Sequence, residues 1–363
     1  MAPETRSVPR RRHRHRRRTP SREGDIGTAD ALRPAKATSA PPTHTVPRRR
    51  HRHRRRTPSR EGDIGTADAH RPAKATSAPP GQDGRVNDLH TAIGTVLDWP
   101  VDHVAATTVA ADGTVLGSAG EIDRPFRLAS VTKLLTAYAT LIAVEEGAVE
   151  WDTPAGPEGS TVRHLAAHVS GLAFTGDAVQ AAVATKRIYS NTGFEVLGAA
   201  IAEAAGIPFA EYLDQAVCEP LGMTATRLEG SPAADGVSTA ADLTRFAAEL
   251  QAPMLTHTLA EATTVAFPGL DGILPGYGRQ KPNDWGLGFE IRDGKSPHWT
   301  GANSSPRTFG HFGQSGTFLW VDPDAGAACV VLTDRDFGPW AIEAWPPFTD
   351  RVLAGIISGG GPL

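Results

Sequence analysis

In the segment RLASVTK, Ser130 and Lys133 stand three residues apart at the start of an apolar stretch. On a helix, positions i and i+3 share a face, so the hydroxyl and the amine can meet. A serine hydroxyl is a poor nucleophile without a nearby base, and a lysine serves as that base only when its pKa falls far below its usual ~10.4. Burial and the positive end of a helix both lower it. Taken alone, the pair is also typical of an N-capping serine followed by a solvated lysine.

A second candidate group, Tyr189-Ser190-Asn191, comes directly before a predicted helix. A phenol near a lysine can relay a proton to a leaving group, and an amide can orient both a substrate and the lysine. Tyr189 could equally be an aromatic residue of the core. Its combination with Ser130 and Lys133 favours a catalytic role.

The third candidate group is Gly310-His311-Phe312-Gly313, on a predicted edge strand. Glycines there let a substrate backbone approach and leave an N–H free. An oxyanion hole needs two such donors, and the backbone N–H groups of Ser130 and Gln314 are the candidates. His311 alone is as typical of an ordinary strand residue, but three groups in this order favour an acyl-transfer site.

The elements that must position these residues follow from periodicity and turn signals. Residues 84–98 carry apolar side chains at helical spacing, and residues 104–109 and 114–118 flank the turn Asp112-Gly113 of an expected hairpin. Residues 131–144 predict a buried helix with Ser130 at its start. Further helices are expected around residues 162–167, 193–205, 209–217 and 241–250, and strands around 308–312, 317–321 and 327–333. A last helix over 341–357 is expected to be interrupted at Pro346-Pro347.

Strands at both ends and helices in the middle predict an α+β fold. We expect an antiparallel sheet flanked by terminal helices, with an all-helical subdomain inserted between its strands. The sheet is expected from about residues 81–128 and 285–363, and the helical subdomain from about 129–284. The cleft between the two parts is the expected place for a site.

Residues 1–80 differ from the rest of the chain in charge and composition. They contain 21 Lys and Arg against 7 Asp and Glu, a net charge of +14, whereas the remaining residues contain 16 against 33, a net charge of −17. Residues 8–42 and 46–80 repeat the same 35-residue unit except at Leu32 and His70. This Arg- and Pro-rich composition predicts a disordered tail. Its basic runs could attach the protein to nucleic acid or another polyanion, or the tail could be a solvated segment without a role or an overextended gene start.

Several classes of protein are excluded by composition. No stretch approaches 18 consecutive apolar residues, which excludes a predicted membrane-spanning helix. Cys218 and Cys329 are too few for a disulfide framework. No apolar region follows the N-terminal arginines, so no export signal is visible, and we expect a cytoplasmic protein with export left open. Nothing in the sequence indicates an oligomeric state.

From about Ile93 to Ile357 the chain resembles the serine β-lactamase and penicillin-binding-protein-like family. The segments that carry the resemblance include FRLASVTK, TVRHLAAHVSGL, YSNTGFEVLGAAI, PLGMTATRL, GLGF and GHFGQSG. The resemblance implies that Ser130 is the acylated nucleophile, Lys133 its base and Tyr189 the second proton-transfer group. It also implies that Asn191 orients substrate, and that His311 and Gly313 form the third motif.

Two departures direct the functional prediction. The third motif reads His-Phe-Gly where typical β-lactamases carry Lys-Thr-Gly, and a neutral His311 would not hold a β-lactam carboxylate as that lysine does. The second motif is Tyr-x-Asn, as in class C enzymes, family esterases and D-amino-acid peptidases. We therefore expect a serine hydrolase that acts through an acyl-enzyme on a carboxylic ester or a D-amino-acid-type amide, with weak β-lactam hydrolysis as a by-product.

Three alternatives stay open. The protein could be a β-lactamase or a D-alanyl-D-alanine carboxypeptidase or transpeptidase proper. It could be a non-catalytic relative that binds a ligand in the cleft, although such a protein has no chemical need for Ser130, Lys133 and Tyr189 together. The tail could make it a nucleic-acid-associated protein.

We expect no cofactor and no metal, and a small-molecule ester, amide or lactam as substrate. His164 and His168 have the i,i+4 spacing of a zinc helix, but the glutamate that a zincin carries after its first histidine is missing. The tryptophans could line a binding surface, although packing in the core is the commoner role for such residues. Those considered are Trp285, Trp320, Trp340 and Trp345.

Overall fold

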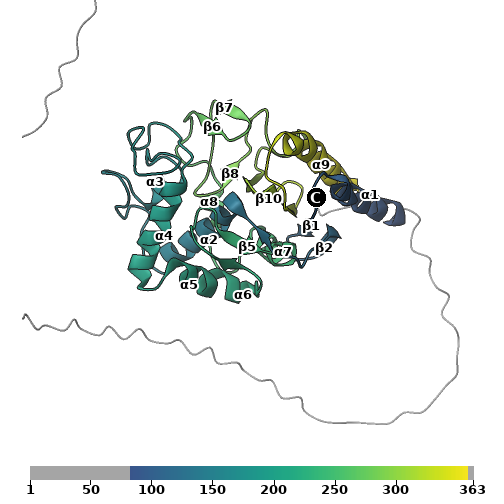
Figure 1. Ribbon diagram of the computed structural model, residues 1–363, viewed down its shortest axis with the longest axis horizontal. Helices are drawn as coiled ribbons and strands as arrows, with labels where there is room; N and C mark the ends of the chain where they lie inside the picture. Colours follow the sequence, from purple (N-terminus) through teal and green to yellow (C-terminus); the bar gives the residue numbers. More distant parts are fainter. Residues whose placement is uncertain (1–81, 359–363) are drawn as a thin grey trace, which may run out of the picture. The chain divides into compact units, whose positions relative to one another are not determined.

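The structure, a computed structural model, describes residues 82–358, so the predicted tail and its repeats lie outside the described residues. Its largest sheet is antiparallel and is built from both ends of the described chain (Figure 1). Across the sheet, the strands follow the order β2 (Val115–Gly120), β1 (Val104–Ala110), β11 (Ala327–Thr333), β10 (Thr317–Asp322), β9 (Phe309–Gly313) and β8 (Glu290–Ile291). The early strand β1 therefore pairs with the late strand β11, with Val104 opposite Thr333 and Ala110 opposite Ala327.

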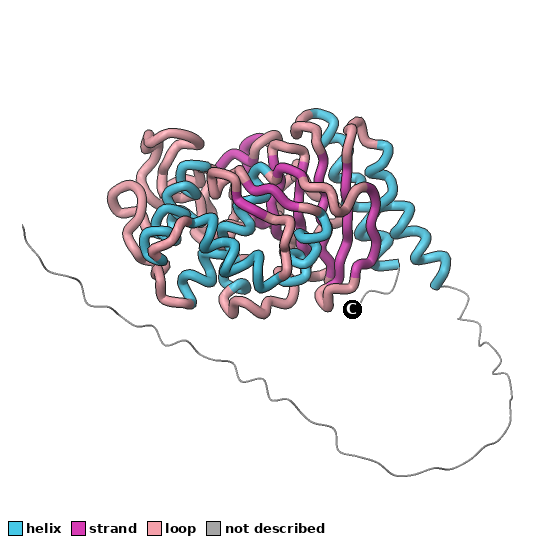
Figure 2. Tube along the Cα trace, turned by 60° about the horizontal axis from the view of Figure 1, so that its bottom comes forward, coloured by secondary structure: helices cyan, strands magenta, loops and turns pink. Residues whose placement is uncertain are grey.

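Both faces of this sheet are buried, as the central strand β11 demonstrates. Because side chains alternate along a strand, Cys329 and Val331 face one layer and Val330 and Leu332 face the other. The first layer is made by α1 (Gln82–Gly94) and α9 (Pro339–Ser358), which pack against each other (Figure 1). The second contains α2 (Thr132–Glu145) and α7 (Ala240–Glu249). In Figure 2 helices accordingly lie on both sides of the strands.

The chain between β2 and β8 supplies the remaining helices and two small sheets. The helices are α3 (Val162–Ala166), α4 (Asn191–Ala205), α5 (Phe209–Leu213), α6 (Glu219–Leu221) and α8 (Leu259–Ala262). The small sheets combine β3 (Phe126–Arg127), β5 (Gly236–Ser238) and β4 (Arg227–Leu228), and β6 (Gly272–Leu274) with β7 (Gly278–Gln280). Helix α2 is buried along nearly its whole length, as its apolar and alanine-rich sequence predicts.

The predicted fold class is confirmed: an antiparallel sheet flanked by terminal helices, with helices inserted between its strands. The predicted interruption at Pro346-Pro347 is wrong, because α9 runs through both prolines. The two carbonyls that lose their helical donors belong to Ile342 and Glu343, which lie on the exposed side of the helix where water can reach them. Trp345 and Phe348, on the other side, are buried against the sheet.

No single described helix is long and apolar enough to cross a membrane. One bent pair, Asn191–Ala205 with Phe209–Leu221, has sufficient length and composition, but it turns by 82° at its break. The division into a tail and a hydrolase domain stays a prediction.

Candidate active site

Ser130 lies in a short 3₁₀ turn, Ala129–Val131, that leads directly into α2. Lys133 lies in the first turn of that helix and has no exposed surface. Its Nζ is 3.5 Å from Ser130 Oγ, 2.7 Å from Asn191 Oδ1 and 2.8 Å from the Ala233 carbonyl oxygen. The structure thus brings together the predicted nucleophile, base and amide. Ala233 could not be found from the sequence, because it contributes only a main-chain oxygen 100 residues away.

The surroundings of Lys133 disfavour its charged form. Burial holds the pKa of Lys133 well below its ordinary value, and the more distant Glu195 carboxylate opposes this only in part. No carboxylate of residues 82–358 pairs with the amine; its Nζ instead lies 4.7 Å from the centre of the Tyr189 ring. A buried lysine without a counter-ion is the arrangement that lets an amine act as a base near neutral pH.

Tyr189 is positioned by the start of α4. Ser190 caps this helix, since its Oγ accepts from the Gly193 N–H at 2.9 Å and donates to the Ala173 carbonyl at 2.6 Å. The Tyr189 hydroxyl is buried and has no hydrogen-bond partner among the described residues. Burial raises the pKa of Tyr189, and the neighbouring Ser130 hydroxyl opposes that rise. The phenol is therefore neutral and available for a new partner.

His311 on β9 is 4 % exposed and faces the same group, with its ring 5.6 Å from the Tyr189 ring. Nδ1 donates to the Phe312 carbonyl at 2.6 Å, which leaves Nε2 as an unprotonated acceptor without a partner in the part of the chain that the structure describes. Burial and, secondly, Lys133 lower the pKa of His311 to about 3. The sequence left the charge of His311 dependent on pH, and these surroundings favour the neutral imidazole.

Gly313 explains how the end of β9 comes close to Ser130. A side chain at this position would place a Cβ only 2.3 Å from the Leu128 carbonyl oxygen and 3.1 Å from Ala129 Cβ. Only glycine therefore allows β9 to pack against the turn that carries Ser130. Gln314 follows at the pocket rim. The assignment of the Ser130 and Gln314 amides as an oxyanion hole stays a prediction.

A pocket of about 250 Å³ opens beside Ser130. It is lined mainly by apolar and aromatic side chains: Ser130, Phe174, Tyr189, Leu274, Pro275, Trp285, Glu290, His311, Phe312 and Gln314. Of the four tryptophans considered from the sequence, Trp285 is the one that lines this pocket. Trp320 and Trp345 are buried between the sheet and α9, and Trp340 packs against the same layer.

One charged side chain in this lining, Glu290, belongs to a buried polar cluster that sequence reasoning missed. Glu290 forms an ion pair with Lys295 and accepts from His298 Nε2 at 2.9 Å and Trp299 Nε1 at 3.0 Å. Lys295 opposes the burial penalty and holds the pKa of Glu290 below its ordinary value. The four residues lie between Glu290 and Trp299 in the chain, but they follow no regular spacing that could have indicated them, and their burial could not be foreseen.

His164 and His168, which have the spacing of a zinc helix, lie in different surroundings. His164 Nδ1 accepts from the Thr161 N–H at 3.2 Å and its ring lies against Phe267, whereas His168 packs against Tyr189. Within residues 82–358, no group of three or more His, Cys, Asp or Glu side chains is arranged to hold a metal ion.

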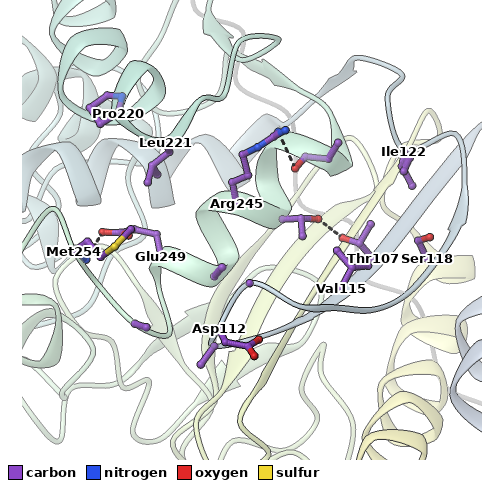
Figure 3. A pocket seen from close by; sticks show the side chains of 16 residues that line it. Thr107, Asp112, Val115, Ser118, Ile122, Pro220, Leu221, Arg245, Glu249 and Met254 are labelled. Carbon is purple, nitrogen blue, oxygen red and sulfur yellow. Dashed lines mark hydrogen bonds between the residues drawn. The ribbon is translucent and has the colours of Figure 1, made fainter. Parts of the chain in front are cut away.

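A larger cavity of about 770 Å³ lies elsewhere, between the β1–β2 hairpin and α7 (Figure 3). The described residues that line it include no lysine, histidine or cysteine. The hydroxyls of Thr107 and Thr244 bind each other at 2.6 Å, and Glu249 accepts from Tyr138 on the core side. Size alone therefore does not mark this cavity as a reaction site, whereas the smaller pocket is lined by Ser130, the predicted nucleophile.

Comparison with known proteins agrees with the class that the fold and the Ser-x-x-Lys geometry define, the β-lactamase and penicillin-binding-protein-like hydrolases. The Beta-lactamase family profile matches residues 102–351, and the chain belongs to this family. A crystal structure of a β-lactamase from Mycobacterium bovis, Mb2281c, is 57 % identical, covers 73 % of this chain and 99 % of that chain, and superposes with a TM-score of 0.72.

Two further relatives are more distant. EstCE1, a hydrolase with promiscuous acyltransferase activity, shares the fold at 17 % identity and a TM-score of 0.59, covering 75 % of this chain and 98 % of that chain. The D-alanyl-D-alanine-carboxypeptidase/endopeptidase AmpH of Escherichia coli is 26 % identical over 149 residues, which are 31 % of this chain. The match spans only about 39 % of the length of that curated relative.

Proposed function

We propose that this protein is a serine hydrolase that works through an acyl-enzyme. The observation that carries the proposal is the environment of Lys133: a buried amine, 3.5 Å from Ser130 Oγ, that forms no ion pair with any of the described residues. When the amine is neutral, its two N–H groups satisfy Asn191 Oδ1 and the Ala233 carbonyl. Its lone pair is then left for the Ser130 hydroxyl, which is the arrangement a general base requires.

The proposed reaction has two halves. Ser130 Oγ attacks the substrate carbonyl while Lys133 accepts its proton, and the oxyanion forms within reach of the Ser130 and Gln314 amides. The bond to the leaving group then breaks, and the leaving atom receives a proton from the Tyr189 hydroxyl, which Lys133 resupplies. Water next attacks the acyl carbonyl, loses its proton to the same groups, and releases the acid with Ser130 restored.

The pocket favours a small, neutral acyl group. Its volume of about 250 Å³ is below the range of drug-sized sites, and its described lining residues include neither lysine nor arginine. Three buried polar atoms there have no partner among the described residues: Tyr189 Oη, Trp285 Nε1 and His311 Nε2. An unpaired buried group costs roughly 1–3 kcal/mol, and a bound ester or amide would provide the missing hydrogen bonds.

Short carboxylic esters are therefore the first substrate class. D-amino-acid-type amides are the second, in line with the D-alanyl-D-alanine carboxypeptidase named among the relatives. β-Lactams carry a carboxylate for which His311, neutral at pH 7, offers no positive charge, so we expect their turnover to be slow.

The test compares the wild type with Ser130→Ala on short-chain p-nitrophenyl esters, a D-amino-acid anilide and a chromogenic cephalosporin. We expect hydrolysis by the wild type alone, and a fluorophosphonate adduct that mass spectrometry places on Ser130. Equal rates from both proteins would refute the proposal. Absence of any adduct across several acylating probes would instead favour the non-catalytic, ligand-binding alternative.

A further inference from the structure

His168, which the proposed reaction does not use, has an unusual backbone. Its φ is +58°, a left-handed conformation that is uncommon for residues other than glycine, although histidine, asparagine and aspartate adopt it more often than most. The residue is 1 % exposed and lies in the turn after α3. Such strain persists only where surrounding contacts enforce it, and it is concentrated at functional sites.

The contacts of His168 converge on Tyr189 from three directions. The His168 carbonyl accepts from the Ile188 N–H at 2.9 Å, and Nδ1 accepts from the Ser190 N–H at 3.2 Å. The imidazole ring lies 4.7 Å from the Tyr189 ring. One residue therefore binds the amides on both sides of Tyr189 and packs on its side chain.

These contacts require a neutral imidazole with its proton on Nε2, because Nδ1 must accept. Burial, Lys133, His311 and Arg187 all lower the pKa of His168 well below its ordinary value. The left-handed backbone of His168 also supports these contacts. It directs the carbonyl and the ring of this one residue to the amides of Ile188 and Ser190, which lie two positions apart.

We propose that His168 is a positioning residue that holds the Tyr189 hydroxyl where it can protonate the leaving group. This inference rests on the proposed serine hydrolase function. It predicts a particular kinetic signature, because a p-nitrophenolate leaves without a proton whereas an alkoxide or amine does not. Loss of His168 should therefore damage reactions with poor leaving groups selectively.

The experiment uses the full-length protein and two esters of the same short acid, one p-nitrophenyl and one ethyl. His168→Gly removes the ring while tolerating the φ of +58°, and His168→Asn tolerates this φ and keeps an acceptor near the position of Nδ1. His164→Ala is the matched control, since His164 Nδ1 also accepts from a backbone N–H at 3.2 Å but lies against Phe267, away from Tyr189.

We expect His168→Gly to lower kcat/KM for the ethyl ester at least ~10-fold more than for the p-nitrophenyl ester, as Tyr189→Phe should. His168→Asn should recover most of that selective loss, and His164→Ala should leave the ratio of the two rates unchanged. Circular dichroism and thermal unfolding monitor folding in every variant.

An equal fall on both esters in His168→Gly, or the same change of ratio in His164→Ala, would overturn the positioning role while leaving the hydrolase assignment intact. No recovery in His168→Asn would also count against it. If Ser130→Ala hydrolyses both esters as fast as the wild type, the hydrolase assignment and the positioning role are both overturned.

Discussion

At the scale of single residues, the proposed reaction depends on excluding water and counter-ions from the amine of Lys133. Lys133 is buried beside aromatic rings, and its hydrogen-bond partners among residues 82–358 are neutral oxygens, so its charged form is disfavoured. His311 is buried in the same place and stays neutral for the same reason. In the proposed reaction, these two potential cations serve instead as a base and a hydrogen-bond acceptor.

This arrangement predicts the pH dependence of activity. We expect kcat/KM to fall with decreasing pH as Lys133 gains a proton, with a midpoint well below the ordinary lysine pKa of 10.5 because burial lowers it. His311, with a pKa of about 3, should contribute no transition near pH 6.5. The acid limb of the p-nitrophenyl ester profile should therefore persist in His311→Asn. A limb that disappears in this variant would show that His311 is the titrating group.

At the scale of elements, the approach of β9 to the turn before α2 determines where Ser130 lies. Thr317 Oγ1 and Ser315 Oγ also bind this turn, through the carbonyls of Leu128 and Arg127 at 2.8 and 2.7 Å. Small or short side chains at the end of β9 and the start of β10 therefore fasten the predicted nucleophile to the sheet.

Gly313→Ala tests this contact. The added methyl would meet the Leu128 carbonyl at 2.3 Å, so we expect the turn to shift, kcat/KM to fall at least ~10-fold and the protein to lose roughly 1–3 kcal/mol of stability. Gly294→Ala is the control, because nothing lies within 4 Å of its added Cβ. Ester kinetics and urea unfolding measure the two effects, and unchanged kinetics in Gly313→Ala would contradict the role given to this contact.

The buried cluster around Glu290 predicts a stability effect. Glu290→Gln leaves the Lys295 charge buried without its partner, which should cost about 3–5 kcal/mol at pH 7. The folded protein holds the pKa of Glu290 below its ordinary value. The stabilisation by the ion pair is therefore complete at a pH above the pKa of Glu290 in the unfolded chain, and it is lost as the pH falls through the pKa of Glu290 in the folded protein.

Urea unfolding of Glu290→Gln, with Glu229→Gln as control, measures the effect. The exposed pair between Arg227 and Glu229 should contribute at most about 1 kcal/mol. The double variant Glu290→Gln with Lys295→Met should recover part of the loss. If Glu290→Gln and Glu229→Gln unfold at the same urea concentration, the buried pair of Glu290 and Lys295 does not stabilise the fold.

At the scale of the whole molecule, the net charge of −3 is the sum of +14 on residues 1–80 and −17 on the remaining residues. Removing residues 1–80 would leave a net charge of −17 and a strongly acidic protein. None of the groups in the proposed reaction lies in the removed segment.

We therefore expect the 81–363 fragment to keep its kcat/KM on p-nitrophenyl esters within about twofold. Binding of the full chain to duplex DNA should fall steeply as salt increases, and the fragment should not bind, because the arginine runs supply the contacts to phosphates. Equal DNA affinity of the fragment would refute a role for the tail in binding. A large loss of esterase activity would show that the reaction requires it.

Much of this protein could be predicted from local patterns. Apolar periodicity and turn signals located α2, α4 and the strands of the main sheet except β8, and the hairpin turn at Asp112-Gly113 agrees with the φ of +84° at Gly113. Motif order identified Ser130, Lys133 and Tyr189 as candidates. The local rule for proline failed at α9, because tertiary packing of Trp345 and Phe348 outweighs two lost helical hydrogen bonds.

The sequence by itself determined which chemical groups are present and which elements carry them, since both depend on residue type and short-range spacing. Only the tertiary structure decided their state. The lowered pKa of Lys133, its bond to the Ala233 carbonyl and the contacts of His168 with the amides around Tyr189 all arise where distant segments exclude water. Desolvation and long-range hydrogen bonds depend on what lies beside a residue in space, which no local pattern encodes.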